Sequence, residues 1–196
     1  MQRAIRLATV EDAPRIAQIY SPYCLETAIS FELDAPTPEE MAERIKNITR
    51  SFPWLVYVID GQVAGYAYAS SHRERPAYRW AADASAYIDK DFHRLGIGRT
   101  LYTALFDLLQ RQGYYVVHAG ITLPNAGSVG LHEAMGFQKV GVFQKVGYKM
   151  GKWHDVAWYQ LNLLIPGEYP AEPKSIWDVI QEASFRGATD NAVECP

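Results

Sequence analysis

The stretch that most constrains the fold is DKDFHRLGIGRTLYTALFDLLQRQG, residues 89–113, where two glycines directly precede a long apolar-periodic run. The apolar positions fall on one face of a helix: Leu101, Leu105, Leu108 and Leu109. A β-prone segment, DASAYID (83–89), comes just before. A strand that passes into a helix through Gly96 and Gly98 leaves its backbone open to close approach, so this turn is a candidate anion-binding site.

The remaining patterns predict a succession of strands and helices. Strands are expected at residues 4–9, 54–60, 62–70, 83–89, 114–122 and 156–164. Helices are expected from an N-cap at Thr9 through Ile16 and Ile19 towards Tyr23, over 37–51, from Gly98 to Gln112 and from Asn125 to Met135. The Asp60-Gly61 pair between two apolar runs predicts a β-hairpin. Antiparallel strands followed by a βαβα segment predict an α/β fold with a mixed sheet.

The length of 196 residues suits one domain with a sizeable core, which we place at residues 1–165. From Pro166 onwards the chain becomes Pro-rich. Residues 166–196 are therefore predicted to form a C-terminal extension that is partly disordered, with the final segment ASFRGATDNAVECP loosely ordered.

Composition disfavours several classes of protein. The formal net charge is -3 with no basic block, which argues against a nucleic-acid partner. No apolar run reaches the roughly 18 residues of a membrane-spanning helix, and the N-terminus lacks the apolar core of a signal peptide. Cys24 and Cys195 match neither a disulfide framework nor a CxxC metal site. A reduced, soluble, cytoplasmic protein without a membrane partner is expected.

Two well-known phosphate-binding loops do not fit the glycine turn. The dinucleotide fingerprint GxGxxG needs a third glycine where this chain has Leu101. A Walker loop needs GxxxxGK followed by Ser or Thr, whereas Gly98 precedes Arg99. An anion is still favoured, because the first helical turn offers unpaired N–H groups and Arg94 adds positive charge. On this pattern alone, a tight turn without any ligand is the open alternative.

The run HRLGIG (93–98) resembles the Q/R-x-x-G-x-G/A motif of the GNAT superfamily of N-acetyltransferases, with His93 where Gln or Arg is commoner. The resemblance covers residues 3 to about 165, and over these residues the chain is similar to the phosphinothricin N-acetyltransferase subgroup. Six blocks carry it in order: ETAISFE (26–32), RERPAYRW (73–80), SAYID (85–89), HRLGIGRTLY (93–102), LPNAGSVGLHEAMGF (123–137) and GYKMGKWHDVAWYQL (147–161). It implies the GNAT acyltransferase fold and a homodimer that uses acetyl-CoA.

The resemblance implies that acetyl-CoA binds along the glycine turn and the strand before it. The main chain of the turn would hold the pyrophosphate, through His93, Arg94, Leu95, Gly96, Ile97 and Gly98. The amide-rich pantetheine arm would pair, like an added strand, with the main chain of Ser85, Ala86 and Tyr87. Asn125 would contact the same arm, and it also fits a plain helix N-cap.

Acetyl transfer to an amine needs a base for the ammonium, stabilisation of the thioester oxygen and a proton for the leaving thiolate. The resemblance implies that Asp83 is the base, at a position where the family has Glu. Because Asp is one methylene shorter, a bridging water is expected to extend its reach. His132 is the implied acid, since imidazole titrates in the useful range. As alternatives, Asp83 caps a strand start and His132 only packs within its helix.

Substrate recognition is assigned to the loop from Ser71 to Trp80. Arg73, Arg75 and Tyr78 could bind carboxylate or phosphinate oxygens, since Arg forms bidentate contacts with such groups. A solvated charge cluster is the alternative. The resemblance adds further substrate-binding positions, some of them across a dimer interface: Phe31, Tyr102, Thr122, Lys145, Val146 and Gly147.

The predicted function is transfer of acetyl from acetyl-CoA to the α-amine of a small glutamate-like amino acid, such as phosphinothricin or methionine sulfoximine. The transfer is expected to be direct, because no cysteine lies in the motif blocks. Two alternatives are a non-catalytic acyl-CoA-binding module and an acetyltransferase that acts on another amine, such as a protein N-terminus.

Two further chemistries are disfavoured. A serine hydrolase does not fit, because Ala126 breaks the GxSxG pattern around Ser128. No metal is expected, because the sequence spacing of the candidate ligands matches no metal motif. These candidates are His118, His132, His154 and Asp155.

Overall fold

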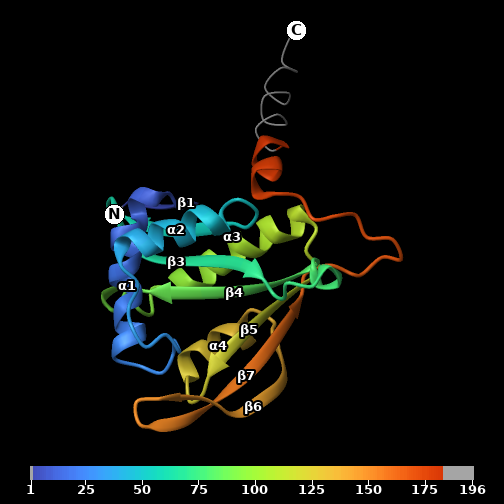
Figure 1. The fold of residues 1–196 in the computed structure, drawn as a ribbon. Coiled ribbons are helices and arrows are strands. Elements are labelled where there is room, and N and C mark those ends of the chain that lie inside the picture. The colour runs from blue at the N-terminus through green and yellow to red at the C-terminus, as the bar shows by residue number, and fades with distance from the viewer. Residues whose placement is uncertain (1, 183–196) are drawn as a thin grey trace.

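A computed structural model describes residues 2–182 as a seven-stranded sheet with helices on both faces (Figure 1). The strands are β1 (Arg3–Leu7), β2 (Trp54–Ile59), β3 (Gln62–Ser71), β4 (Ala81–Ile88), β5 (Val116–Thr122), β6 (Gln138–Lys149) and β7 (Lys152–Asn162). Their order is β1-β2-β3-β4-β5-β7-β6, with β4 and β5 parallel and all other neighbours antiparallel. The predicted mixed α/β architecture is confirmed.

Four labelled α-helices accompany the sheet within residues 2–182, besides the helical residues 176–182: α1 (Ala13–Leu25), α2 (Pro38–Ile48), α3 (Ile97–Gln112) and α4 (Ala126–Ala134). Three short 3-10 helices lie in the connecting segments: η1 (Val10–Asp12), η2 (Pro76–Tyr78) and η3 (Lys90–Phe92). The predicted capping box of α2 is present, since the Glu40 amide donates to Thr37 Oγ1 (3.2 Å) and the Thr37 amide donates to Glu40 Oε2 (2.8 Å).

The sequence of β2 explains how one sheet is covered on both faces. Its run WLVYVI is apolar at every position, and side chains of a strand point alternately to the two faces. Leu55 and Ile59 join the core that contains Leu101 and Leu105 of α3. Val56 joins a second core, formed with α1 and α2. The helices therefore form two outer layers around the sheet.

The two halves of the sheet separate between β4 and β5. β4 pairs with β3 from Ala82 to Ile88, and β5 pairs with β7 along its whole length. Between β4 and β5 only three residue pairs form, the last of them Asp83 opposite His118. Beyond that pair the strands diverge, and Figure 1 shows them opening into a V. The edge of residues 84–88 that faces β5 therefore has no strand partner.

The sequence patterns missed β6 and placed the start of the last strand at residue 156, whereas β7 begins at Lys152. β6 is the outer edge strand, and most of its side chains are exposed on both faces. Gly141 and Gly147 further interrupt its apolar pattern. A strand that buries neither face lacks the alternation on which the prediction relied.

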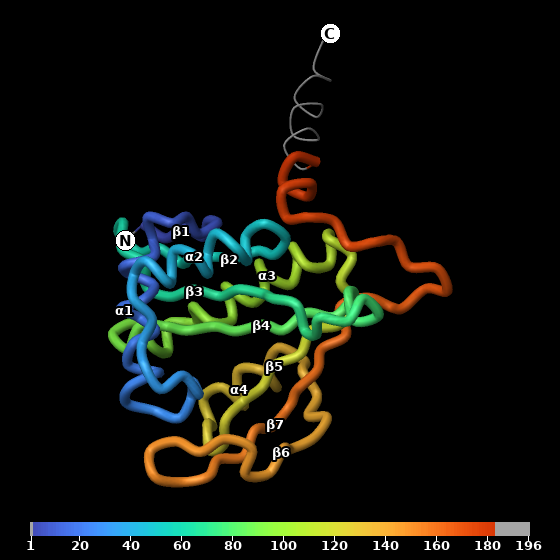
Figure 2. Tube along the Cα trace, viewed as in Figure 1, coloured from blue at the N-terminus to red at the C-terminus, as the bar shows by residue number. Residues whose placement is uncertain are grey.

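The described part of the C-terminal extension packs against the domain. It leaves β7, bends outward and returns to the end of α3 (Figure 2). Residues 176–182 are helical, and the side chain of Ile176 is fully buried. Gln112 Nε2 donates to the carbonyl of Lys174 (2.8 Å), and Trp177 Nε1 donates to the carbonyl of Thr49 (2.9 Å). The segment predicted to be loosely ordered, 183–196, lies outside the described residues.

None of the helices within residues 2–182 is long and apolar enough to cross a membrane.

Replacing Ile176 by alanine tests whether the extension is part of the folded unit. We expect Ile176→Ala to lower the free energy of unfolding by about 2–4 kcal/mol, because it removes a fully buried aliphatic side chain. Urea unfolding followed by fluorescence measures this. Ile165→Ala is the matched control, since that side chain is 93% exposed and its loss should change stability by less than about 0.5 kcal/mol. Equal stability of the two variants would contradict docking of the extension.

Candidate active site

The V between β4 and β5 forms a cleft, here called the strand cleft. Its walls come from both strands, from α3 and α4, and from the loop after α1. The lining residues are Ile29, Ala84, Ser85, Ala86, Tyr87, Tyr102, Ala119, Gly120, Ile121, Thr122, Asn125, Ser128 and His132. Seven predicted site residues therefore meet in one place: Ser85, Ala86, Tyr87, Tyr102, Thr122, Asn125 and His132.

The wall made by β4 offers backbone groups rather than charged side chains. Pairing with β5 stops at Asp83, so the backbone N–H and C=O groups of residues 84–88 on that side have no strand partner. Such groups favour a ligand that can complete the ladder, because a peptide-like amide matches the spacing of a missing strand. The edge fits the amide-rich arm of acetyl-CoA, as the sequence predicts for residues 85–87.

The glycine turn lies at the end of the same strand and leads into α3. Arg94 and Gly96 both take left-handed backbone angles, with φ of +62° and +78°. Thr100 donates to the carbonyl of Gly96 (3.1 Å) as the first bond of the helix, so the amides of the first turn have no intrahelical partner. Left-handed residues next to a helix N-terminus turn successive amides towards one side, which suits a phosphate.

Gly98 has a different role from Gly96. A Cβ built at Gly98 would lie 3.1 Å from Leu131 Cδ2, so the bare backbone lets α4 pack closely on the start of α3. Nothing lies within 4 Å of a Cβ built at Gly96, where the left-handed angle is the reason for glycine. The first glycine therefore shapes the turn, and the second brings two cleft-lining helices together.

His93, the unusual member of the motif, fastens the turn to β4. Its Nε2 lies 3.0 Å from the carbonyl of Ile88 and 3.3 Å from the hydroxyl of Tyr23. The Tyr23 hydroxyl also donates to the Ile88 carbonyl (2.5 Å). The imidazole nitrogen is thus engaged within the protein, which assigns His93 a role in holding the loop.

Asp83 lies in β4 at the vertex of the V, one residue before the cleft-lining Ala84. Its Oδ1 is 2.7 Å from Nδ1 of His72, which follows β3. Burial raises the pKa of Asp83 above its ordinary value, and this outweighs the lowering by His72, His118 and Arg73. A raised pKa moves the carboxylate towards the range of a useful general base.

The sequence analysis did not single out His72. The imidazole ring stacks on that of His118, with 4.2 Å between centroids and 21° between the planes. The register of β3 and β4 is what would have located His72, since Ser70 pairs with Asp83 and Ser71 with Ala82. His72 is the next residue of this ladder, diagonal to Asp83 across the strands. The sequence alone read residues 71–81 as a loop and so hid this register.

His132 is buried in α4 and forms a pair with Tyr102 of α3. Its Nδ1 is 2.7 Å from the carbonyl of Ser128, and its Nε2 is 3.2 Å from the hydroxyl of Tyr102. A carbonyl only accepts, so Nδ1 carries the proton and Nε2 accepts from Tyr102. Burial lowers the pKa of His132 and raises that of Tyr102. The Tyr102 hydroxyl is therefore the donor of this pair, and its proton is directed at Nε2 of His132.

Ser128 is not placed to be a hydrolase nucleophile. It lies within α4, and its amide donates to Asn125 Oδ1 (3.1 Å), which caps the helix as predicted. The Ser128 hydroxyl is 3.3 Å from His132 Nδ1, but that nitrogen donates to a carbonyl and has no lone pair for the serine proton. The pair cannot act as nucleophile and base.

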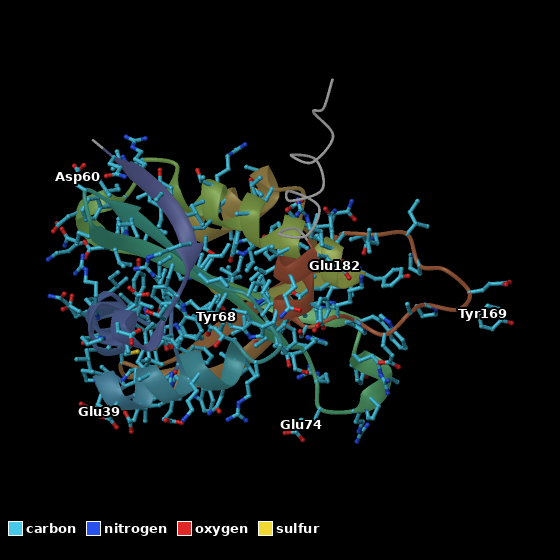
Figure 3. The ribbon with its side chains drawn as sticks, turned by 90° about the horizontal axis from the view of Figure 1, so that it is seen from above. Glu39, Asp60, Tyr68, Glu74, Tyr169 and Glu182 are labelled. Carbon is cyan, nitrogen blue, oxygen red and sulfur yellow. The ribbon has the colours of Figure 1, made fainter. Side chains whose placement is uncertain are left out.

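A second cavity of about 560 Å³ lies against the loop after β3, and we call it the loop cavity. Its lining residues are Ser71, His72, Arg73, Glu74, Arg75 and Tyr78. Figure 3 shows Glu74 at the outer rim of this loop and Tyr169 at the tip of the extension. Neither Arg73 nor Arg75 forms an ion pair with any carboxylate of residues 2–182. Three of the predicted substrate residues thus surround a space of small-ligand size.

The far end of the loop is tied to the C-terminal extension. Arg79 forms an ion pair with Glu172, and Trp80 Nε1 donates to the carbonyl of Ala171 (2.8 Å). Figure 2 shows the extension running past this loop. The contacts hold the segment that carries Arg75 and Tyr78 between β3 and the extension.

Residues 5–158 match the family described as Acetyltransferase (GNAT) domain. The chain belongs to the GNAT acetyltransferase family. It is 38% identical over 177 residues to a phosphinothricin N-acetyltransferase of Streptomyces viridochromogenes, covering 90% of this chain and 94% of that protein. It is 32% identical over 160 residues to an L-methionine sulfoximine/L-methionine sulfone acetyltransferase of Salmonella typhimurium, covering 81% of this chain and 94% of that protein.

A solved structure shows the same fold with a ligand. The GNAT superfamily phosphinothricin acetyltransferase of Sinorhizobium meliloti, in complex with acetyl-CoA, superposes with a TM-score of 0.82 at 32% identity. The match covers 90% of this chain and 99% of that one. The predicted family and fold are confirmed, and the protein is a GNAT acetyltransferase.

Four predicted substrate residues line neither cavity of this GNAT domain: Phe31, Lys145, Val146 and Gly147. Phe31 sits over Gly147, where a Cβ would lie 2.2 Å from its ring, so the glycine makes room for the aromatic side chain. Lys145 and Val146 lie in an irregular stretch of β6, and the Lys145 amide donates to Asp155 Oδ1 (2.8 Å). Lys149, the last residue of β6, links this strand to α1 and the loop after it by donating to the carbonyls of Cys24, Ser30 and Glu32.

The residues weighed as metal ligands from the sequence do not gather into one group. Within residues 2–182, the group of ligand atoms close enough for an ion is His72, Asp83 and His118, whose atoms lie within 4.8 Å of one another. His118 Nδ1 is buried without a hydrogen-bond partner, and burial lowers the pKa of His118. His154 Nε2 instead donates to the carbonyl of Lys149 (3.0 Å). The prediction that the enzyme uses no metal stays a prediction.

Proposed function

We propose that this GNAT enzyme transfers acetyl from acetyl-CoA to the α-amine of a small glutamate-like amino acid. The observation that carries the proposal is the position of Asp83, at the vertex of the V between the strand cleft and the loop cavity. One cavity suits the acetyl donor and the other an anionic amino acid. The printed names of the relatives, which act on phosphinothricin and methionine sulfoximine, support this substrate class.

Acetyl-CoA is proposed to bind along β4 and the glycine turn. The pantetheine amides pair with the open edge at residues 85–87, and the pyrophosphate rests on the amides of residues 93–98. Asn125 lines the same cleft, but its side-chain oxygen already caps α4. It therefore reaches the cofactor only through its amide nitrogen or its backbone.

Each proton that moves in the reaction is assigned to a group of the protein. Asp83 is the basic group that takes a proton from the substrate ammonium, and its raised pKa suits this role. The hydrogen-bonded pair of His132 and Tyr102, which lines the cleft, supplies a proton to the sulfur that leaves, with the Tyr102 hydroxyl turning from His132 to the thiolate. The transfer is direct, and Cys24 is no acyl carrier, because it is fully buried and burial raises the pKa of its thiol.

The amino acid is proposed to bind through Arg73, Arg75 and Tyr78. Two guanidinium groups without carboxylate partners favour a substrate with two anionic groups, such as a carboxylate and a phosphinate. Herbicide resistance would follow from acetylation of phosphinothricin itself. The cytoplasmic location stays a prediction.

Thiol release from acetyl-CoA with a panel of amino acids tests the function. We expect phosphinothricin, methionine sulfoximine and glutamate to give the highest kcat/KM, and Asp83→Ala to lower kcat at neutral pH by about 100-fold or more, because a general base contributes that much. The affinity for acetyl-CoA should stay unchanged. Equal rates for wild type and Asp83→Ala would remove Asp83 from the mechanism.

The same assay separates substrate binding from the alternatives. Arg73→Gln and Arg75→Gln should raise KM for the acidic amino acids about tenfold or more while kcat changes little. Arg111→Gln is the matched control, since Arg111 pairs with Asp107 on the exposed face of α3. Release of CoA with an N-terminal peptide but with no amino acid would favour a protein substrate. No release with any amine, despite acetyl-CoA binding, would favour a binding module.

We further propose a homodimer built on the outer hairpin of β6 and β7. Large apolar side chains gather there, each at least half exposed: Val140, Phe143, Val146, Tyr148, Met150 and Trp153. A continuous apolar surface of this kind is typical of an interface. A second copy on this surface would also approach Lys145 and Val146, two of the predicted substrate residues that line neither cavity.

Charged substitutions on the hairpin test the dimer. Wild type should sediment at twice the chain mass, and the double variant Phe143→Glu with Trp153→Glu should sediment as a monomer, because two carboxylates cannot be buried unpaired. Tyr169→Glu is the control, since this 94% exposed side chain lies outside the hairpin. A wild type that is monomeric at all concentrations would contradict the proposal.

A further inference from the structure

We propose that His72 is the group that removes the proton from the substrate amine, with Asp83 as the carboxylate that orients it. The inference rests on the function proposed above and refines its proton path. The sequence analysis expected a water to extend the reach of Asp83, which is one methylene shorter than the family's Glu. In the structure the imidazole of His72 already lies within hydrogen-bond distance of this carboxylate.

The hydrogen bond fixes which nitrogen of His72 can act. Asp83 Oδ1 lies 2.7 Å from Nδ1, and an ionised carboxylate only accepts, so the proton of neutral His72 is on Nδ1. The lone pair is then on Nε2. His72 lines the loop cavity together with Arg73, Arg75 and Tyr78, so its side chain borders the space assigned to the amino acid. The same division of roles operates in carboxylate–histidine pairs of hydrolases.

The ring of His72 is held in place on several sides. His118 stacks on one face, and Tyr78 and Trp158 approach edge-on with centroids 6.0 Å and 6.1 Å away. The His72 side chain is 11% exposed, whereas that of Asp83 is 32% exposed. A base that is locked in one orientation before the substrate binds loses little freedom in the reaction.

The groups that face the His72 ring carry charges of both signs. Asp83 is the anionic group in contact, Tyr78 and Arg73 come from its own loop, and His118 comes from β5. Because burial lowers the pKa of His118, the stacked ring stays neutral and does not repel an imidazolium. Arg73 opposes the positive charge, and the carboxylate of Asp83 offsets it at shorter range.

The proton balance of the reaction closes with these groups. The substrate ammonium gives one proton to Nε2 of His72, and the freed lone pair forms the N–C bond at the thioester carbonyl. The C–S bond then breaks, and the second nitrogen proton ends on the CoA sulfur by way of the Tyr102 hydroxyl, which passes on one proton and takes up another. His72 returns its proton to water, so the ammonium and acetyl-CoA yield the N-acetylated amine, the CoA thiol and one proton.

The same three residues could instead hold a metal, but the ring geometry disfavours it. Lone pairs of imidazole lie in the ring plane, and the planes of His72 and His118 are nearly parallel at 4.2 Å. Nitrogen atoms in such planes do not converge on one ion at about 2.1 Å, the usual zinc–nitrogen distance. Metal binding would require a ring to turn, whereas the pair with Asp83 already has its bond.

Kinetics of His72 variants test the proposal. His72→Phe keeps an aromatic ring in the stack and should lower kcat at neutral pH by about 100-fold or more, with unchanged affinity for acetyl-CoA. His72→Ala should be as slow, and added imidazole should restore activity in proportion to its free-base form. Arg111→Gln, on the exposed face of α3, is the control and should leave kcat unchanged. A fully active His72→Phe, or His72→Ala that imidazole does not restore, would overturn the proposal.

A second readout does not depend on activity. Nitrogen-15 NMR of the imidazoles should show neutral His72 protonated at Nδ1, with Asp83→Asn reducing that preference. Protonation at Nε2 would overturn the inference even if the enzyme acetylates amino acids, and absence of any acetylation would refute the proposed function without changing the tautomer. Activity that is lost on treatment with EDTA would assign His72, Asp83 and His118 to a metal and reject the base.

Discussion

The structure depends on the early end of pairing between β4 and β5. Three residue pairs join the two halves of the sheet, while β3 and β7 hold their partners along nearly the full length. The divergence creates an unpaired strand edge inside a folded domain without exposing it at the periphery. It also sets Asp83 at the last paired position, next to Ala84 of the strand cleft and in hydrogen-bond contact with His72 of the loop cavity. Donor binding and proton removal are therefore two consequences of one break in the sheet.

The glycine turn extends this arrangement towards the phosphates. Gly96 provides a left-handed turn and Gly98 admits Leu131 of α4, so one short motif both shapes an anion site and closes the cleft wall. His93 adds a clamp between the turn and β4. The motif is thus more than a phosphate loop, since it also fixes the position of α4 and so of His132.

Much of the fold could be predicted from the sequence, because apolar periodicity and capping residues act locally. The capping box at Thr37, the Asp60-Gly61 hairpin and the leucine face of α3 all appear where the patterns place them. β6 could not be found in this way, because an edge strand that buries neither face carries no periodic signal. The divergence of β4 from β5 could not be predicted either, because it depends on how the two strands pair and the pattern of each strand alone does not show it.

The site, like the fold, contains residues that could be placed from the sequence and residues that could not. Cleft residues such as Ser85 and Tyr102 could be placed because the family motif contains them. His72 could not, because its role arises from a strand register that a polar loop conceals. The structure also pairs His132, the acid that the resemblance implies, with Tyr102, whose hydroxyl donates to Nε2 of His132. Which side chains lie close together in space is known only from the structure, even where each residue can be picked out in the sequence.

Hydrogen–deuterium exchange of β4, with and without acetyl-CoA, tests the central claim most directly. The amides of residues 84–88 that face β5 have no strand partner, so they should exchange rapidly in the free enzyme and become protected when acetyl-CoA binds. Amides of β2, paired on both sides by β1 and β3, should not change. Unaltered exchange at residues 84–88, with acetyl-CoA binding confirmed by calorimetry, would contradict the account.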